Sequence, residues 1–425
     1  MKTINLSNMD IKIYYEKLKN GLEIYLIPKD NVSDTYALFT TKYGSVNSEF
    51  VPIGEDEMVK VPDGIAHFLE HKLFESEDGV HPFTFYNEQG ADVNAFTNYF
   101  NTSYLFSGTE NIEDCMNYLL DYVQKPYFTE ENVEKEKGII EQELLMYKDI
   151  PIDQMYDLTF ANAFEKHPVR IPIGGTPSSI KKITKDDLYT CYNTFYHPTN
   201  MFVTVSGNFD YKKMLKLITD NQAKKEFCPP FEIQNQTYDE PDEVTKQKET
   251  VKMNVSIPKV TISFKINLEK FKKLSNRLIA MYIMLYFDSK LGSTSILLEK
   301  LKKEKIVTTG INIDHLRTDK HVLVIVNTDT LAKDEFTSAI HKTLKEKTIT
   351  EEEFERKRKI LISRNIFDSD SPHRINSRLL NTLITDNKVI DYDTEIRNLT
   401  FKDYQNVVKN LDLSNYTELI IEPLK

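Results

Sequence analysis

The motif HFLEH, residues 67–71, contains the side chains best suited to catalysis in this chain. On a helix, His67, Glu70 and His71 would share one face, because residues three and four apart are neighbours there. Two neutral imidazoles on one turn can bind a zinc ion, and a hydrolytic zinc site takes three protein ligands and a water. Glu70 would lie beside that water and could accept its proton. The motif therefore predicts a zinc-dependent hydrolase that needs only zinc and water.

The third zinc ligand must come from another segment, and residues 133–147, VEKEKGIIEQELLMY, offer four glutamates. At 100° per residue, Glu136 and Glu143 fall together at one border of the apolar stripe of a helix. Glu134 and Glu141 fall together at the other border. Helix geometry therefore leaves two pairs of carboxylates open.

The elements that must position these residues follow from the apolar pattern. Residues 22–28 and 36–44 are predicted as paired strands, because each is rich in β-branched and aromatic residues and ends at a turn-forming Pro or Gly. After Asp63, a candidate N-cap, the spacing becomes helical and places both histidines on a helix. Residues 92–107 are predicted as two strands, and a long helix is expected from about 129 to 147.

The length of the chain, 425 residues, exceeds the size at which one hydrophobic core usually keeps growing, so two domains are expected. Residues 228–249 combine prolines, charges and polar residues without periodicity, as an interdomain linker does. We therefore expect an N-terminal zinc-binding domain at 1–227 and a C-terminal domain at 250–425 without a metal motif. No convincing sequence repeat relates the two halves.

Composition excludes several partners. A net charge of −11 argues against nucleic acid, which is bound through clustered Lys and Arg. The longest uncharged apolar run, residues 278–287, is about half the length that crosses a bilayer, so no membrane partner is expected. The N-terminal segment has no apolar core of a secretory signal, and three widely spaced cysteines suit a reducing compartment. These features predict a cytoplasmic protein.

The sequence also resembles a known family. HFLEH followed by EKGIIEQE at residues 136–143 resembles the paired signatures of the insulinase and pitrilysin-type metallopeptidases, which include the mitochondrial processing peptidase. The resemblance implies that Glu143 is the third zinc ligand and that Glu136 serves catalysis by keeping the ligands oriented. The stretch VNAFTNYFNTSYLF is similar to the family's substrate-binding edge strand. This similarity implies that Asn94, Ala95 and Phe96 face the bound peptide.

The chain length and the variant KLFESEDG after the zinc motif look most like the short bacterial two-domain branch of this family. That resemblance implies an α+β fold with two homologous domains, each a mainly antiparallel sheet with helices packed on one face. One such chain would form half of a clamshell.

The function implied is that of a zinc metalloendopeptidase subunit acting on short or unfolded peptides, with removal of a leader peptide among the compatible roles. An extended peptide would add to the edge strand through main-chain hydrogen bonds. The alternatives are a non-catalytic peptide-binding or assembly subunit of the same fold and a zinc enzyme acting on another class of substrate.

A homologous partner chain is also implied. Self-sufficient members of the family carry an Arg and a Tyr in one loop of the second half, which hold the substrate carbonyl. The matching stretch here, LEKLKKEKIVTTGINID, has Lys303 where the Arg belongs and Thr309 where the Tyr belongs. No tyrosine occurs between residues 296 and 330. The resemblance thus implies a heterodimer in which the partner supplies Arg and Tyr.

Overall fold

A computed structural model describes residues 1–6, 9 and 11–424 of the chain. The chain forms two compact units, each built from three segments. The first comprises Met1–Leu144, Pro172–Thr237 and Arg364–Thr394, and the second comprises Leu145–Ile171, Tyr238–Ser363 and Glu395–Lys425. The predicted linker, residues 228–249, contains the point at which the chain passes from the first unit to the second. Two further segments, one from each half of the sequence, belong to the unit of the other half.

The first unit is built on a seven-stranded sheet in the order β1-β2-β3-β9-β4-β8-β7. Every pair of neighbours is antiparallel except β3 and β9, which are parallel. A small second sheet has the order β10-β5-β6. The strands of this unit are β1 (Lys2–Leu6), β2 (Ile11–Lys17), β3 (Glu23–Pro28), β4 (Thr35–Thr41), β5 (Glu49–Val51), β6 (Val59–Lys60), β7 (Asp92–Thr97), β8 (Thr102–Gly108), β9 (Met201–Gly207) and β10 (Gln234–Asn235).

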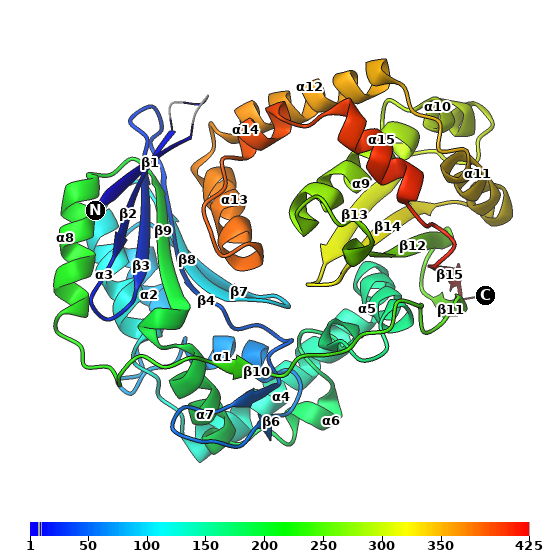
Figure 1. The fold of residues 1–425 in the computed structure, drawn as a ribbon. Helices are drawn as coiled ribbons and strands as arrows, with labels where there is room; N and C mark the ends of the chain where they lie inside the picture. The colour runs from blue at the N-terminus through cyan, green and yellow to red at the C-terminus, as the bar shows by residue number, and fades with distance from the viewer. Residues whose placement is uncertain (7–8, 10, 425) are drawn as a thin grey trace. The chain divides into compact units, whose positions relative to one another are not determined.

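Helices cover both faces of this sheet. The main core lies between the sheet and helices that include α1, α3, α7 and α8. Helix α13, from the second half of the sequence, packs Ile375, Leu379 and Leu383 on the opposite face (Figure 1). The helices are α1 (Ile65–Lys72), α2 (Pro82–Glu88), α3 (Ile112–Val123), α4 (Glu130–Lys148), α6 (Pro177–Ile180), α7 (Lys185–Phe195), η2 (Pro198–Asn200), α8 (Tyr211–Gln222) and α13 (Pro372–Thr385), with α4 continuing into the second unit.

The second unit has a five-stranded sheet in the order β11-β15-β12-β14-β13. Its strands are β11 (Lys248–Met253), β12 (Lys259–Asn267), β13 (Asn312–Arg317), β14 (His321–Asp329) and β15 (Tyr416–Pro423). Its helices are α5 (Pro151–Ala163), η1 (Pro168–Arg170), η3 (Leu268–Lys270), α9 (Asn276–Leu291), α10 (Ile296–Lys303), α11 (Lys333–Lys345), α12 (Glu351–Asp368), α14 (Tyr392–Arg397) and α15 (Phe401–Asn410), with α12 and α14 shared between the units. Across the described residues, no helix combines the length and apolar character of a bilayer span.

The two units share one strand topology. Five strands of each sheet correspond. Across the sheet they lie in the order β3-β9-β4-β8-β7 in the first unit and β11-β15-β12-β14-β13 in the second. Numbered along the chain, both orders read 1-5-2-4-3. In each, the first and fifth strands are parallel and the other neighbours are antiparallel. The predicted α+β class, with mainly antiparallel sheets and packed helices, is confirmed, and the repeat is visible in the topology.

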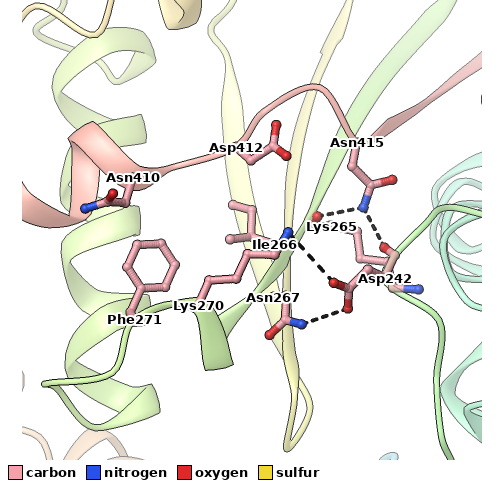
Figure 2. Close-up of a pocket in the computed structure, with 9 residues that line it drawn as sticks. All are labelled: Asp242, Lys265, Ile266, Asn267, Lys270, Phe271, Asn410, Asp412 and Asn415. Carbon is pink, nitrogen blue, oxygen red and sulfur yellow. Dashed lines mark hydrogen bonds and ion pairs between the residues drawn. The ribbon is translucent and has the colours of Figure 1, made fainter.

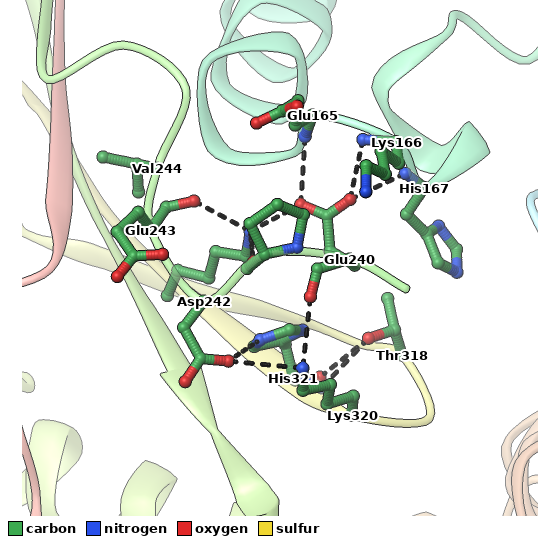
Figure 3. A network of polar contacts seen from close by, with 12 residues as sticks. Glu165, Lys166, His167, Glu240, Asp242, Glu243, Val244, Thr318, Lys320 and His321 are labelled. Atoms are coloured by element: carbon green, nitrogen blue, oxygen red, sulfur yellow. Dashed lines mark hydrogen bonds and ion pairs between the residues drawn. The ribbon is translucent and has the colours of Figure 1, made fainter. Parts of the chain in front are cut away.

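The linker is anchored in the second unit by a buried ion pair. Glu240 accepts hydrogen bonds from the backbone N–H groups of Glu165, Lys166 and His167 at 2.8–3.0 Å, and its side chain lies 2.6 Å from the Lys265 ammonium (Figure 3). Two residues further on, Asn267 donates to the Asp242 carboxylate at 2.8 Å, in a small polar pocket (Figure 2). These contacts fix the linker to the sheet beneath it.

Glu240→Gln is expected to lower the free energy of unfolding of this unit by about 3 kcal/mol at pH 7, because it leaves Lys265 buried without its counter-charge. Burial raises the pKa of the Glu240 carboxyl, but Lys265 and the three backbone donors outweigh burial and lower it to about 2. The stabilisation is therefore complete above the ordinary value of 4.5 and is lost as the pH falls toward 2. Thermal unfolding of both proteins between pH 7 and 2 checks this, and a difference that stayed constant with pH would contradict it.

Candidate metal centre

Helix α1 carries the HFLEH motif. Ile65, Phe68 and Leu69 are buried in the main core, and this holds the helix against the sheet. The N-cap is Gly64, with φ of 91°, and no side chain caps the helix. The predicted N-cap, Asp63, is therefore wrong by one residue. The N-cap position here is in the left-handed conformation, which glycine adopts at little cost.

His67, His71 and Glu143 converge on one point. The Glu143 carboxylate lies 3.8 Å from His67 Nε2 and 3.4 Å from His71 Nε2, and one ligand atom from each residue lies within 4.8 Å of the others. Ligand atoms around a tetrahedral zinc ion are about 3.3–3.5 Å apart, given bonds of about 2.0–2.2 Å. Glu143 Oε2 is buried, and no described residue donates a hydrogen bond to it. The three side chains thus fit a zinc ion.

Glu136 lies about two helical turns before Glu143 on α4 and contacts the other ring nitrogen of His71. Its carboxylate is 3.0 Å from His71 Nδ1, so a proton on Nδ1 leaves Nε2 free as a ligand atom. Burial lowers the pKa of His71, but the hydrogen bond with Glu136 and the charges of Glu143, Glu136 and Glu70 outweigh burial and raise it. Burial, with the neighbouring His71, lowers the pKa of His67 to about 4. That imidazole is therefore neutral at pH 7, as a metal ligand must be.

The other pair of glutamates on α4 points away from the histidines. Glu141 pairs with Lys181 at 2.8 Å, and the largely exposed Glu134 pairs with Lys137 on its own helix. The structure therefore brings Glu136 and Glu143, rather than Glu134 and Glu141, to the two histidines.

Glu70 is held by a residue that the sequence did not single out. Thr97, the last residue of β7, donates its hydroxyl to Glu70 Oε2 at 2.6 Å. Burial raises the pKa of Glu70, and the hydrogen bond from Thr97 partly offsets this. Thr97 lies in the predicted substrate strand directly after Phe96. Its side chain is on the same face of the strand as that of Ala95, two residues earlier, and this alternation could have indicated it. Its hydroxyl fixes the direction in which Glu70 points.

The predicted substrate-binding residues lie on β7, the edge strand next to β8. The Asn94 side chain is exposed and accepts a hydrogen bond from the Ala95 N–H at 2.8 Å. Phe96 packs against the core on the α13 face of the sheet, whereas Ala95 packs against the main core. β7 is the last strand in the sheet order, so one of its edges has no strand partner among the described residues of the first unit, as addition of a peptide strand requires.

The second unit has an ion pair at the position that corresponds to the contact between Glu136 and His71 in the first unit. Counted from the first residue of each helix, Glu136 is the seventh residue of α4 and Lys357 is the seventh residue of α12. Lys357 is buried and binds Asp288 of α9 at 2.7 Å, whereas Glu136 binds His71 of α1. Among the residues described, the group of side chains that could hold a metal ion lies in the first unit only.

The two residues implied to replace Arg and Tyr are both exposed in the second unit. Lys303, the last residue of α10, pairs with Glu299 at 3.0 Å. Thr309 lies in the loop between α10 and β13. Neither has a planar or phenolic donor group.

Two family models match successive parts of the chain. Residues 53–177 match the family model of insulinase (peptidase family M16), and residues 182–361 match that of the peptidase M16 inactive domain. The uncharacterized zinc protease YmfH of Bacillus subtilis (strain 168) is 39% identical over 413 residues, which is 96% of each chain.

Two solved structures are also similar to this chain. An M16-like protein from Alicyclobacillus acidocaldarius has a TM-score of 0.91 and 31% identity, covering 97% of this chain and 99% of the other. A protease from Helicobacter pylori, 19% identical, has the same fold, with a TM-score of 0.83 over 97% of this chain and 100% of its own. The resemblance inferred from the two signatures is confirmed, and the chain belongs to peptidase family M16, the insulinase family.

Proposed function

We propose that this chain is the zinc-binding subunit of a metalloendopeptidase, with His67, His71 and Glu143 as the metal ligands. The observation that carries the proposal is the convergence of two imidazoles and one carboxylate, with one ligand atom of each within 4.8 Å of the others. Zinc bound there would polarise the scissile carbonyl and acidify a water.

The remaining residues have separate tasks in this proposal. Glu70 accepts the proton of the attacking water and returns it to the leaving amine, which makes it the general base and acid. Thr97 keeps the Glu70 carboxylate aimed by its hydrogen bond of 2.6 Å. Glu136 keeps a proton on His71 Nδ1 and so keeps Nε2 available.

The substrate proposed is a short or unfolded peptide that adds to β7 as an extra strand. Asn94, Ala95 and Phe96 would face it, and Asn94 would have to release the Ala95 N–H for a main-chain hydrogen bond. Main-chain hydrogen bonds give affinity without selectivity for side chains. Leader-peptide processing and general peptide turnover are therefore both compatible with this mode of binding. Three free cysteines, of which Cys228 is exposed, support a cytoplasmic site of action.

The alternative proposal is a non-catalytic peptide-binding subunit of the same fold. An edge strand alone would serve such a subunit, which has no need for converging metal-ligand side chains. Measurement of bound metal therefore separates the two functions directly.

The test of the proposal is zinc affinity in two matched variants of α4. Glu143→Ala is expected to weaken zinc binding at least about 100-fold, because one of three protein ligands is lost. Glu141→Ala, two positions away and paired with Lys181, is expected to bind zinc as the wild type does. Competition with a chromophoric chelator measures both affinities. Full zinc retention in Glu143→Ala would remove Glu143 from the ligand set.

A further inference from the structure

Two glycine turns meet beside the metal-ligand helices with no space between their backbones. Gly64 directly precedes α1, and Gly174 and Gly175 lie in the loop before α6. A Cβ on Gly64 would lie 2.3 Å from the Gly174 carbonyl oxygen, and one on Gly175 would lie 2.4 Å from the Asp63 carbonyl oxygen. Each turn therefore excludes a side chain on the other.

Both turns also need glycine for their backbone conformation. Gly64 has φ of 91° and Gly175 has φ of 72°, in the left-handed region that other residues rarely adopt. Gly175 closes its turn by donating its N–H to the Pro172 carbonyl at 2.8 Å. The contact between the turns is thus formed by rigid main chain rather than by adaptable side-chain ends.

The same loop contacts both helices that carry the proposed ligands. A Cβ on Gly174 would lie 2.6 Å from Leu144 Cδ2 on α4 and 3.5 Å from His67 Nδ1 on α1. Leu144 is buried and follows Glu143 directly. The loop therefore lies against one histidine ligand and against the residue next to the carboxylate ligand.

We infer that the loop Pro172–Gly175 is a positioning element of the metal centre, which sets the separation of α1 and α4 and so the distance between His67 and Glu143. This inference rests on the proposed zinc site. Groups that orient metal ligands without binding the ion typically change metal affinity 10- to 100-fold when they are altered. Displacement of the loop is expected to act in that range.

The experiment compares two glycines, Gly175 and Gly79, that have the same φ but different surroundings. Gly79 also has φ of 72°, but a Cβ there would meet nothing within 4 Å. Gly175→Ala and Gly79→Ala therefore both place an alanine at φ of 72°, and only the first forces the loop away from Asp63. The dissociation constant for zinc is measured for each apo-protein by chelator competition, well below the unfolding temperature found by circular dichroism.

Gly175→Ala is expected to weaken zinc binding about 10- to 100-fold, and Gly79→Ala is expected to match the wild type. A merely structural role would lower the unfolding temperature and leave zinc affinity unchanged. If Gly175→Ala does not fold, Gly174→Ala replaces it, with Gly138→Ala of α4 as its control, because a Cβ on Gly138 meets nothing within 4 Å.

The outcomes separate this inference from the proposed function. Equal zinc affinity in the wild type and in the loop variant would overturn the role of the loop and leave the zinc site intact. A wild-type chain that took up no zinc would overturn the proposed function and the inference with it.

Discussion

Glu70→Gln is expected to retain zinc and to lose peptide hydrolysis by about 10²- to 10⁴-fold, which is the usual contribution of a general base and acid. The amide has the shape of the carboxylate but cannot accept the proton of the water. Glu70 lies between the two histidines in sequence, and its Oε2 accepts the Thr97 hydroxyl at 2.6 Å. Zinc content by elemental analysis and turnover of a fluorogenic peptide, with the partner chain present, measure the two effects separately.

Glu141→Gln serves as the matched control for this experiment. It makes the same chemical change on a neighbouring helix, at a carboxylate that faces Lys181 and not the histidines. Its turnover is expected to equal that of the wild type. Hydrolysis by Glu70→Gln at a rate near the wild type would show that another group accepts the proton.

The HFLEH helix could be predicted from the sequence because its determinants are local. The third ligand could not be chosen from geometry alone, because residues seven apart on a helix return to the same angle. Two borders of α4 therefore offered equivalent pairs of glutamates. Only tertiary packing, which turns the border with Glu136 toward His71, distinguishes them. The resemblance to the family selected the pair that the structure brings to the histidines.

The two-unit architecture could be predicted only in part. Chain length and the linker indicated two domains, but α13 and α5 each pack in the unit of the other half of the chain. An amphipathic stripe such as Ile375, Leu379 and Leu383 shows that a helix face is buried, not which sheet buries it. Such an exchange depends on contacts between residues distant in sequence.

The repeat between the units escaped detection for a related reason. A strand of the sheet needs apolar residues at alternate positions, and many different sequences meet this condition. Two units can therefore keep the same strand topology without detectable sequence similarity. At the seventh position of the long helix, Glu136 corresponds to Lys357, and the partner of that lysine is Asp288. At this position the chemistry therefore differs between the units although the strand topology is the same.

The purified single chain is expected to hydrolyse peptides about 10²- to 10³-fold more slowly than the same chain mixed with a homologous partner. Losing one donor that holds the negative charge developing on the substrate carbonyl costs about that factor. Lys303 cannot replace an arginine in a planar, two-pronged role, and Thr309 is too short to replace a phenol. Both side chains are exposed, and Lys303 pairs with Glu299 of its own helix.

The assay compares this chain alone with this chain and the similar-length homologue encoded nearest to it in the genome. A second mixture contains Glu70→Gln of this chain with the same wild-type homologue. If the two chains form one active site, zinc comes from this chain and the carbonyl donors come from the other. The first mixture should then be active and the second inactive, because the partner cannot replace Glu70. Comparable zinc-dependent turnover by the single chain would contradict the heterodimer and would assign the carbonyl donors to a second copy of this chain.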